Sequence, residues 1–306
     1  MKWTVYISAI LLLCNTQSVI AQHIDLSHNG LRASDKNMKE SVNVSISHNN
    51  GKTLWIVQTM SDKDYVCQKI FSDSYTPYDV SYSELGQIYH FSTDKCSLVL
   101  QRTENNQMSI GYDLAETFLP STFSYGDSIS GLFHGIGTYC DKLNIRTCGQ
   151  YSLSADAYGD LLTAEGDTIN NVMRIHTRRL RHTELMPFTK QPSAYGVFTD
   201  DSIQTCLAND SMLIEENYYR WYAHGYRYPI LEQYNAHNSR NSICNYSLYY
   251  PPLQQQLLDL DDINLEPRNA FAEKKTMTDG AFDGNGSKSI DYKCDMNGDA
   301  YDDSAL

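Results

Sequence analysis

The residues from Phe123 to Arg181 constrain the fold most, because they repeat one local rule: short strand-like runs separated by glycine and aspartate. Gln150–Ala155 is predicted to be a strand, a break follows at 156–160, and Leu161 begins the next strand. The sequence Ala-Glu-Gly-Asp at 164–167 predicts a hairpin loop, because glycine takes positive φ without a Cβ clash and aspartate bonds nearby amides. This segment is therefore predicted to be an antiparallel meander.

The strand after this loop alternates apolar and basic side chains over 173–178, so one face is apolar and the other is basic. A row of basic side chains on one strand face is able to hold a sulfate, a phosphate or a carboxylate. Arg174, His176 and Arg178 are therefore a candidate anion site. The commoner alternative is a solvated face of the sheet, balanced by acidic neighbours.

Similar short runs occupy most of the chain. Val42–Ile46 and 53–57 alternate around an Asn-Gly turn, and the 23 tyrosines favour strands and half-buried positions. These patterns predict an all-β fold, an antiparallel meander or β-sandwich in one or two domains. We expect an N-terminal β region over 22–115 and a central and C-terminal antiparallel β region over 116–250.

The ends of the chain differ from this β-rich part. Lys2 followed by the apolar run Val5–Cys14 predicts a signal peptide over 1–21, cleaved after Ala21, and export to the periplasm, cell surface or medium. No later apolar stretch is long enough for a transmembrane helix. Residues 251–306 hold twelve Asp or Glu against five Lys or Arg, which predicts an acidic, largely disordered tail.

Bulk charge and motifs limit the function. A formal charge of −13 argues against a nucleic-acid partner, since binding to phosphates needs a basic surface. Nucleotide-binding loops and HExxH are lacking, so no cofactor is expected. Seven cysteines follow the expected cleavage site without C-x-x-C spacing, so no metal site is expected either. Cys67–Cys96 and Cys206–Cys244 are plausible disulfides, with at least one thiol left over.

The densest aromatic segment is a candidate binding surface. The strands 215–222 and 226–232 are predicted to face one another across a three-residue hairpin at 223–225. Aromatic faces beside arginine stack on sugar rings or anchor a protein, so a glycan or an envelope protein is the expected partner. The alternative is cross-strand packing within a core. The candidate binding residues are Tyr218, Arg220, Trp221, Tyr222, Tyr226 and Tyr228.

One short motif suggests an enzyme. Gly126-Asp127-Ser128-Ile129 resembles the G-D-S-[LI] block of the GDSL esterases, in which the serine is the nucleophile. A nucleophilic serine needs a base and an oxyanion hole, and the available D-x-x-H, Asp25 to His28, lies upstream in the wrong order. Ser128 is thus a weak catalytic candidate, and the alternative is a turn in which Asp127 caps nearby amides.

The expected signal peptide ending in Ala-Gln and three blocks carry a wider resemblance: FSYGDSISGLFHGIGTYCDKL, ADAYGDLLTAEGDTINNVMRIHT and RWYAHGYRYPILE. Together they resemble uncharacterised β-rich exported proteins of Gram-negative bacteria that use type IX secretion. The resemblance covers about 85–250 and implies a C-terminal immunoglobulin-like sorting domain. Here Ser289–Cys294 would be the first strand of that domain, cut short.

The sequence leaves three functions open. The first is a non-catalytic exported binding or envelope-associated β-protein that uses the aromatic hairpin. The second is a secreted hydrolase that uses Ser128, and the third is a purely structural surface component. An exposed nucleophile beside a histidine would separate the hydrolase from the other two.

Overall fold

The computed structural model describes residues 23–49, 52–95, 97–188, 198–258 and 261–269, and the backbone of two short strands at 293–294 and 300–301. The expected signal peptide lies outside the described residues. The helices are α1 (Leu26–Asn29), α2 (Asp200–Asn209) and α3 (Pro252–Gln256), and a further helix covers 262–269. The strands are β1 (His23–Asp25), β2 (Lys36–Asn49), β3 (Lys52–Thr59), β4 (Tyr65–Phe71), β5 (Val80–Glu84), β6 (Gln87–Asp94), β7 (Ser97–Glu104), β8 (Met108–Leu119), β9 (Thr122–Ser124), β10 (Ser128–Tyr139), β11 (Leu143–Leu162), β12 (Thr168–Pro187), β13 (Ile214–Tyr222), β14 (Leu231–His237), β15 (Ser242–Tyr249), β16 (Lys293–Cys294) and β17 (Ala300–Tyr301).

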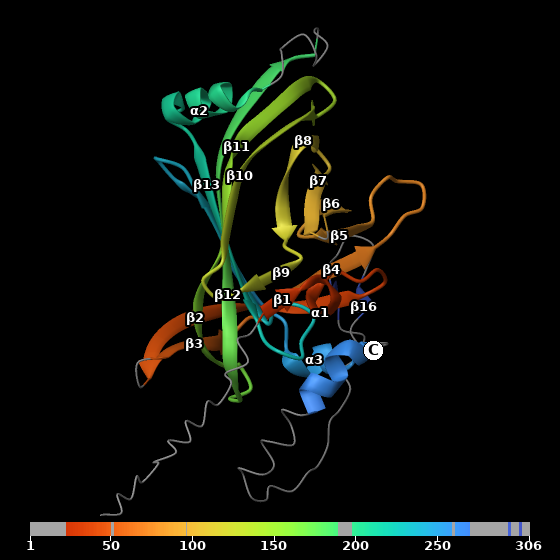
Figure 1. Ribbon diagram of the computed structural model, residues 1–306, viewed down its shortest axis with the longest axis vertical. Helices are drawn as coiled ribbons and strands as arrows, with labels where there is room; N and C mark the ends of the chain where they lie inside the picture. Colours follow the sequence, from red (N-terminus) through yellow and green to blue (C-terminus); the bar gives the residue numbers. More distant parts are fainter. Residues whose placement is uncertain are drawn as a thin grey trace, which may run out of the picture.

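Most of these strands belong to one sheet that closes on itself. The strands β4, β5, β6, β7, β8 and β10 form one antiparallel meander, and β11 to β15 form another. They are joined through β2 on one side and through the pairing of β10 with β11 on the other. In Figure 1 the long β11 and β12 form one wall, and β5 to β8 lie opposite. The predicted all-β antiparallel fold is confirmed, and the closed sheet is more specific than the meander or sandwich expected.

The strand β3 bridges two parts of this sheet. It pairs antiparallel with β2 and parallel with the end of β11, so β2, β15, β14, β13, β12, β11 and β3 form a second, smaller ring. Gly159 permits this close approach, because a Cβ at that position would lie 2.2 Å from the backbone oxygen of Thr53. The expected domain boundary after residue 115 falls inside β8, so strands from both expected regions share one sheet.

The wall that the two rings share separates two hydrophobic cores. Successive side chains of a strand point to opposite faces. Met173 and Tyr222 therefore belong to the core inside the larger ring, whereas Val172 and Trp221 belong to the core inside the smaller ring. There Trp221 packs edge-on against Trp55, with ring centroids 5.9 Å apart. Both tryptophans are almost completely buried.

The predicted hairpin between β11 and β12 is confirmed. Gly166 has a φ of +92°, and its amide donates to the carbonyl of Thr163. The break expected at 156–160 is wrong: β11 continues through it with register shifts at Ala155/Ala157 and Gly159/Leu161. A β-bulge accommodates the glycine and the extra residue without ending the strand.

The aromatic segment 223–230 connects β13 and β14 and is not the second strand of a tight hairpin. Trp221 pairs with Leu231 across the two strands. The hairpin expected at 223–225 is therefore wrong, and Tyr226 and Tyr228 lie in the connection.

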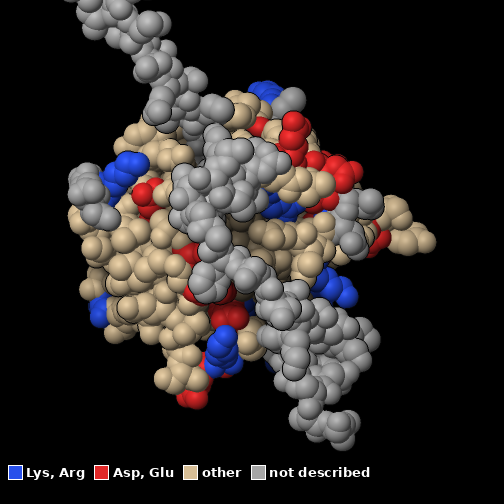
Figure 2. Space-filling model, turned by 90° about the horizontal axis from the view of Figure 1, so that it is seen from below, with Lys and Arg blue, Asp and Glu red and all other residues tan. Residues whose placement is uncertain are grey.

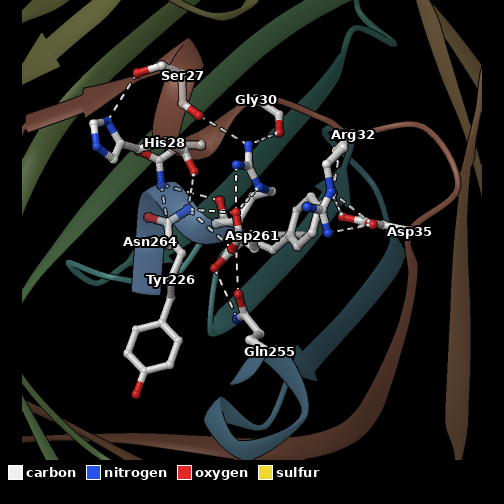
Figure 3. A network of polar contacts seen from close by, with 12 residues as sticks. Ser27, His28, Gly30, Arg32, Asp35, Tyr226, Gln255, Asp261 and Asn264 are labelled. Carbon is white, nitrogen blue, oxygen red and sulfur yellow. Dashed lines mark hydrogen bonds and ion pairs between the residues drawn. The ribbon is translucent and has the colours of Figure 1, made fainter. Parts of the chain in front are cut away.

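Segments from both ends of the described chain hold this connection in place (Figure 3). Asn29, in α1, donates its side-chain amide to the carbonyls of Tyr226 and Arg227, at 3.1 and 3.2 Å. The Arg227 guanidinium donates to one carboxylate oxygen of Asp261, from Nη2 at 2.7 Å and from Nε at 2.9 Å. Bonds from distant segments therefore override the strand propensity of these aromatic residues.

The acidic tail begins with two helical segments, so the disorder predicted for the tail does not extend to 251–258 and 261–269. Gln255, in α3, is fully buried and exchanges two hydrogen bonds of 3.1 Å with the backbone of Tyr228. Composition alone gave no sign of these contacts. Most of the remaining tail lies outside the described residues.

Candidate binding cavity

The larger ring encloses a cavity of about 640 Å³. This volume falls in the range of small-molecule sites in proteins, roughly 300 to 1,000 Å³. Exposed residues at one end, Leu85 and Cys244, mark its mouth. The side chains that line it are aromatic, aliphatic and charged, contributed mainly by β5 to β8, β12, β13 and β15.

Strand alternation explains which side chains enter the cavity. Thr177, Arg179 and Arg181 of β12 line it, and the intervening residues of the strand face outward. On β13 the lining residues are Glu216, Tyr218 and Arg220. Arg181 pairs with Ile214 at the start of β13, whereas Arg220 pairs with Ile175 further along the two strands.

Two of the three lining arginines are neutralised by carboxylates. Glu216 accepts from Arg179 Nη1 at 3.0 Å and from Arg181 Nη2 at 3.2 Å. Arg179 Nε also lies 2.7 Å from Glu116 Oε2. Burial raises the pKa of Glu216, but the two guanidinium groups outweigh burial and lower this pKa to about 2. For Glu116 burial dominates, and its pKa is raised.

A second buried charge cluster lies beside the cavity. The ammonium of Lys39 is 2.7 Å from Glu84 Oε1 and 2.5 Å from Glu232 Oε2. All three side chains are almost fully buried. Glu232 lies directly opposite Arg220 in the ladder, yet its carboxylate is turned to Lys39.

Arg220 is the remaining cavity arginine. Glu232 and Glu84 act on its charge electrostatically, but no carboxylate among the described residues lies within ion-pair distance of it. Its side chain is 4% exposed, and its guanidinium carbon lies 4.1 Å from the ring centre of Tyr218 and 4.2 Å from that of Phe118. Among the described residues it makes no hydrogen bond or ion pair, and its Nε is buried without an acceptor. The two rings hold the guanidinium plane in one orientation. An immobilised cation with unused donors thus lies deep in the cavity.

Tyrosines form much of the remaining polar lining. The ring centroids of Tyr82 and Tyr89 lie 4.8 Å apart. Tyr234 stacks on Tyr246 with ring centroids 5.2 Å apart. Burial raises the pKa of Tyr82 and Tyr218 well above the usual value, so their hydroxyl groups stay neutral and able to donate. The apolar part of the lining comprises Phe91, Leu100, Met108, Ile110 and Phe118.

The structure divides the predicted aromatic site among three places. Tyr218 and Arg220 line the cavity. Trp221 and Tyr222 are buried in the two cores, on opposite faces of β13. The two connection residues also belong to these cores. Tyr228 is buried in the larger core with its hydroxyl donating to Asp35 at 2.7 Å, and Tyr226 packs against the smaller core. The expected exposed aromatic surface is therefore wrong, because Trp221 is only 1% exposed.

The basic stripe of β12 lies on the face opposite the apolar one, as predicted, and here that face points away from the cavity. Acidic and polar neighbours engage it. Arg174 makes two parallel bonds of 2.9 Å to Asp156. Arg178 makes two similar bonds to Glu215, at 2.8 and 3.0 Å. The third member, His176, bonds Asn217, and its ring stacks on Tyr219. The arrangement corresponds to the solvated, charge-balanced face that was the alternative to an anion site.

Ser128 lies at the exposed start of β10, and the adjacent turn follows the structural alternative. Asp127 accepts a bond of 2.8 Å from the amide of Ser124, and Gly126 has a φ of +92°. Within the described segments, Ser128 makes no hydrogen bond to a histidine or carboxylate, so no base is in place. The upstream Asp25 is the N-cap of α1, where it accepts from the amide and the ring nitrogen Nδ1 of His28.

The cysteines depart from the predicted pairing. Cys206 and Cys244 are both free thiols, so the Cys206–Cys244 disulfide is wrong. Cys206 instead contacts the thiol of Cys148. Cys67 is not among the free thiols, but its expected partner Cys96 lies outside the described residues, so that pairing stays a prediction.

Sequence reasoning missed most of the cavity. Arg179, Arg181 and Glu216 continue the alternation of β12 and β13, which was followed only as far as residue 178. Extending the period-two pattern would have placed both arginines on the inner face. The tyrosines of β5, β6 and β15 gave no local signal, because only the long-range closure of the sheet brings them together.

The molecular surface, the helices and the comparisons add three findings. Seen from below, the Lys and Arg side chains on the described surface are separated from one another (Figure 2). Across the described segments, every helix is too short or too polar to traverse a lipid bilayer. Comparison with protein-family models, with curated proteins and with solved structures finds no match to this chain.

Proposed function

We propose that this protein is a non-catalytic, exported binding protein that holds a small amphipathic carboxylate inside the closed sheet. The observation that supports this most is Arg220, a buried guanidinium that faces the cavity without a hydrogen bond or ion pair among the described residues. A buried charge without such partners is costly. A carboxylate that accepts two parallel bonds from the guanidinium would satisfy it.

The rest of the lining fits the remainder of such a ligand. The aliphatic and phenyl groups of Phe91, Leu100 and Ile110 offer an apolar wall, and the tyrosine hydroxyls offer neutral donors. Glu84 and Glu116 also line the cavity, and they disfavour a second anionic group. A ligand with one carboxylate and an apolar body therefore matches the charges better than a dianion does.

The proposed binding site lies inside the closed sheet, not on the surface as expected from the sequence. The earlier expectation of a glycan used Tyr218, Arg220 and four further aromatic residues as an exposed platform. A neutral sugar would use the tyrosines but would supply no anionic acceptor for the Arg220 guanidinium, so it is the main competing ligand class.

Calorimetric titration with decanoate, decanol and decylamine tests the proposal, because the three probes share one apolar chain. We expect decanoate to bind and decanol to bind about 10- to 100-fold more weakly, the range of a charge-assisted hydrogen bond. Arg220→Gln should remove the preference for the carboxylate. The matched control is Arg174→Gln, on the outer face of β12, which should bind as the wild type does. Equal affinity for decanoate and decanol, or an unchanged preference in Arg220→Gln, would contradict the proposal.

Export is proposed from the N-terminal sequence alone. The apolar run Val5–Cys14 and the small residue Ala21 support cleavage before Gln22. Protein recovered from outside the cytoplasm of its native host should begin at Gln22 on N-terminal sequencing. Recovery of full-length protein from the cytoplasm alone would contradict this part.

A further inference from the structure

A second polar cluster lies outside the cavity, on the outer face of β11 and β12. The ladder places Cys148 directly opposite His182, and Arg146 directly opposite Glu184. Residues two apart on a strand share a face. These four side chains therefore form a compact square on one face of the sheet.

The helix α2 covers this square and adds a thiol. Its N-cap, Thr199, forms a reciprocal capping box with Ser202, which fixes the start of the helix. Ile203 is fully buried against Cys148 and Phe198, which holds the helix on the sheet. One turn later, Cys206 is directed toward the sheet, where it contacts the thiol of Cys148. In Figure 1, α2 lies against the upper part of this wall.

The potential ligand atoms converge. A ring nitrogen of His182, a carboxylate oxygen of Glu184 and the Cys206 sulfur all lie within 4.8 Å of one another. His182 Nε2 is 3.2 Å from Glu184 Oε1. Ligand atoms around a tetrahedral zinc ion lie roughly 3.3 to 3.8 Å apart, as follows from bond lengths of about 2.0 to 2.3 Å. Small side-chain movements would bring these atoms to such distances.

A further carboxylate orients the histidine. His182 Nδ1 lies 2.6 Å from Asp210 Oδ2, and Asp210 is the C-cap of α2. A histidine that binds a metal through one nitrogen commonly donates from the other nitrogen to a carboxylate, which fixes the tautomer and the ring orientation. Asp210 would serve as this positioning residue, leaving Nε2 free to bind a metal beside Glu184 and the Cys206 thiol.

We propose that His182, Glu184, Cys206 and Cys148 form a binding site for a divalent transition-metal ion of the zinc class. Two thiolates and one carboxylate would bring three negative charges against the two positive charges of the ion. Arg146 supplies a compensating positive charge beside the site, with its Nη1 3.6 Å from Glu184 Oε2. A mixed sulfur, nitrogen and oxygen ligand set suits zinc better than magnesium or calcium. Binding would join α2 to the sheet.

Titration of the full-length chain with cobalt(II) tests the site, in the presence of a reductant that does not bind metals. One equivalent should produce the visible bands of tetrahedral cobalt and the ultraviolet band of cobalt–thiolate bonds, and zinc should displace it. Cys206→Ser and His182→Gln should lose these bands. The matched control Cys244→Ser removes an exposed free thiol at the cavity mouth and should keep them.

A further variant tests whether Asp210 orients His182 for metal binding. Asp210→Asn should keep the absorption bands and weaken zinc affinity about 10- to 100-fold, measured by competition with a chromophoric chelator. The proposal is overturned if the reduced wild type binds no cobalt or zinc, or if Cys206→Ser binds as the wild type does. It is also overturned if protein from its native host holds a Cys148–Cys206 disulfide, seen as a mass lower by two hydrogens.

Discussion

The guanidinium of Arg227 and the carboxylate of Asp261 form a buried ion pair, with side chains 9% and 1% exposed. The pair joins the connection between β13 and β14 to the segment before the last described helix. Two hydrogen bonds reach the same carboxylate oxygen, at 2.7 and 2.9 Å. The start of the tail is thus part of the folded protein.

We therefore expect Asp261→Ala to lower the free energy of unfolding by about 3 to 5 kcal/mol, because it leaves the Arg227 charge buried without its counter-ion. The control Asp262→Ala removes an exposed carboxylate next in sequence and should stay within about 0.5 kcal/mol of the wild type. Urea denaturation measures both. Equal stability of the two variants would show that the tail does not support the fold.

The smaller ring should depend on its tryptophan pair. Trp55→Ala removes a fully buried side chain that packs edge-on against Trp221, and a loss of about 3 to 5 kcal/mol is expected. The control Tyr75→Ala removes a side chain that is 96% exposed and should have little effect. Decanoate affinity of the folded Trp55→Ala variant should be unchanged, because Trp55 lies on the opposite side of the wall from the cavity. A selective loss of binding without a loss of stability would contradict this assignment.

The pH dependence of stability should include a contribution from Glu216. Its pKa in the folded chain is lowered from 4.5 to about 2, since Arg181 and Arg179 outweigh the effect of burial. The unfolded chain therefore binds this proton at a higher pH than the folded chain does. The stabilisation, on the order of 3 kcal/mol, is present above a pH of about 4.5 and is lost as the pH falls toward about 2.

Denaturation of the wild type and of Glu216→Gln at neutral pH and at acidic pH measures this contribution. The wild type should lose more stability on acidification than Glu216→Gln does. Glu266→Gln, a change at an exposed carboxylate, should keep the wild-type pH dependence. Identical pH dependence of all three proteins would exclude a role for Glu216 in acid stability.

Ser128 should not act as a nucleophile. It makes no hydrogen bond to a base within the described segments, and a serine without a base is a poor nucleophile at neutral pH. The purified protein and its Ser128→Ala variant should hydrolyse p-nitrophenyl acetate at the same background rate. A clear loss of hydrolysis in the variant would instead support the esterase alternative.

Local sequence patterns correctly predicted strand faces and tight turns, because these features depend on residues close together in the chain. The alternation around Ile175 placed its face correctly, and Gly166 marked the hairpin because its positive φ is a property of the turn itself. The prediction of a break near Tyr158 was wrong, because glycine and aspartate occur both where a strand ends and where it continues through a β-bulge. The helical Gln255 was missed because its support comes from the distant backbone of Tyr228.

The cavity was predictable only in part for the same reason. Tyr218 and Arg220 were identified as binding residues from aromatic density, and both line the cavity. Their direction was not predictable, because it depends on the pairing of β10 with β11 and of β2 with β4. Trp221 shares the same local signal and yet faces the other core. Strand alternation separates these neighbours only once the closed sheet defines an inside.

The most direct test of the binding proposal observes the Arg220 guanidinium itself. Nitrogen-15 NMR of the arginine Nε–H groups, with the Arg220 signal assigned from its absence in Arg220→Gln, reports its hydrogen bonding. The account predicts that decanoate shifts the Arg220 signal selectively, that decanol does not, and that the signal of the outer Arg174 stays in place. A ligand that binds while the Arg220 signal remains unshifted would contradict the account.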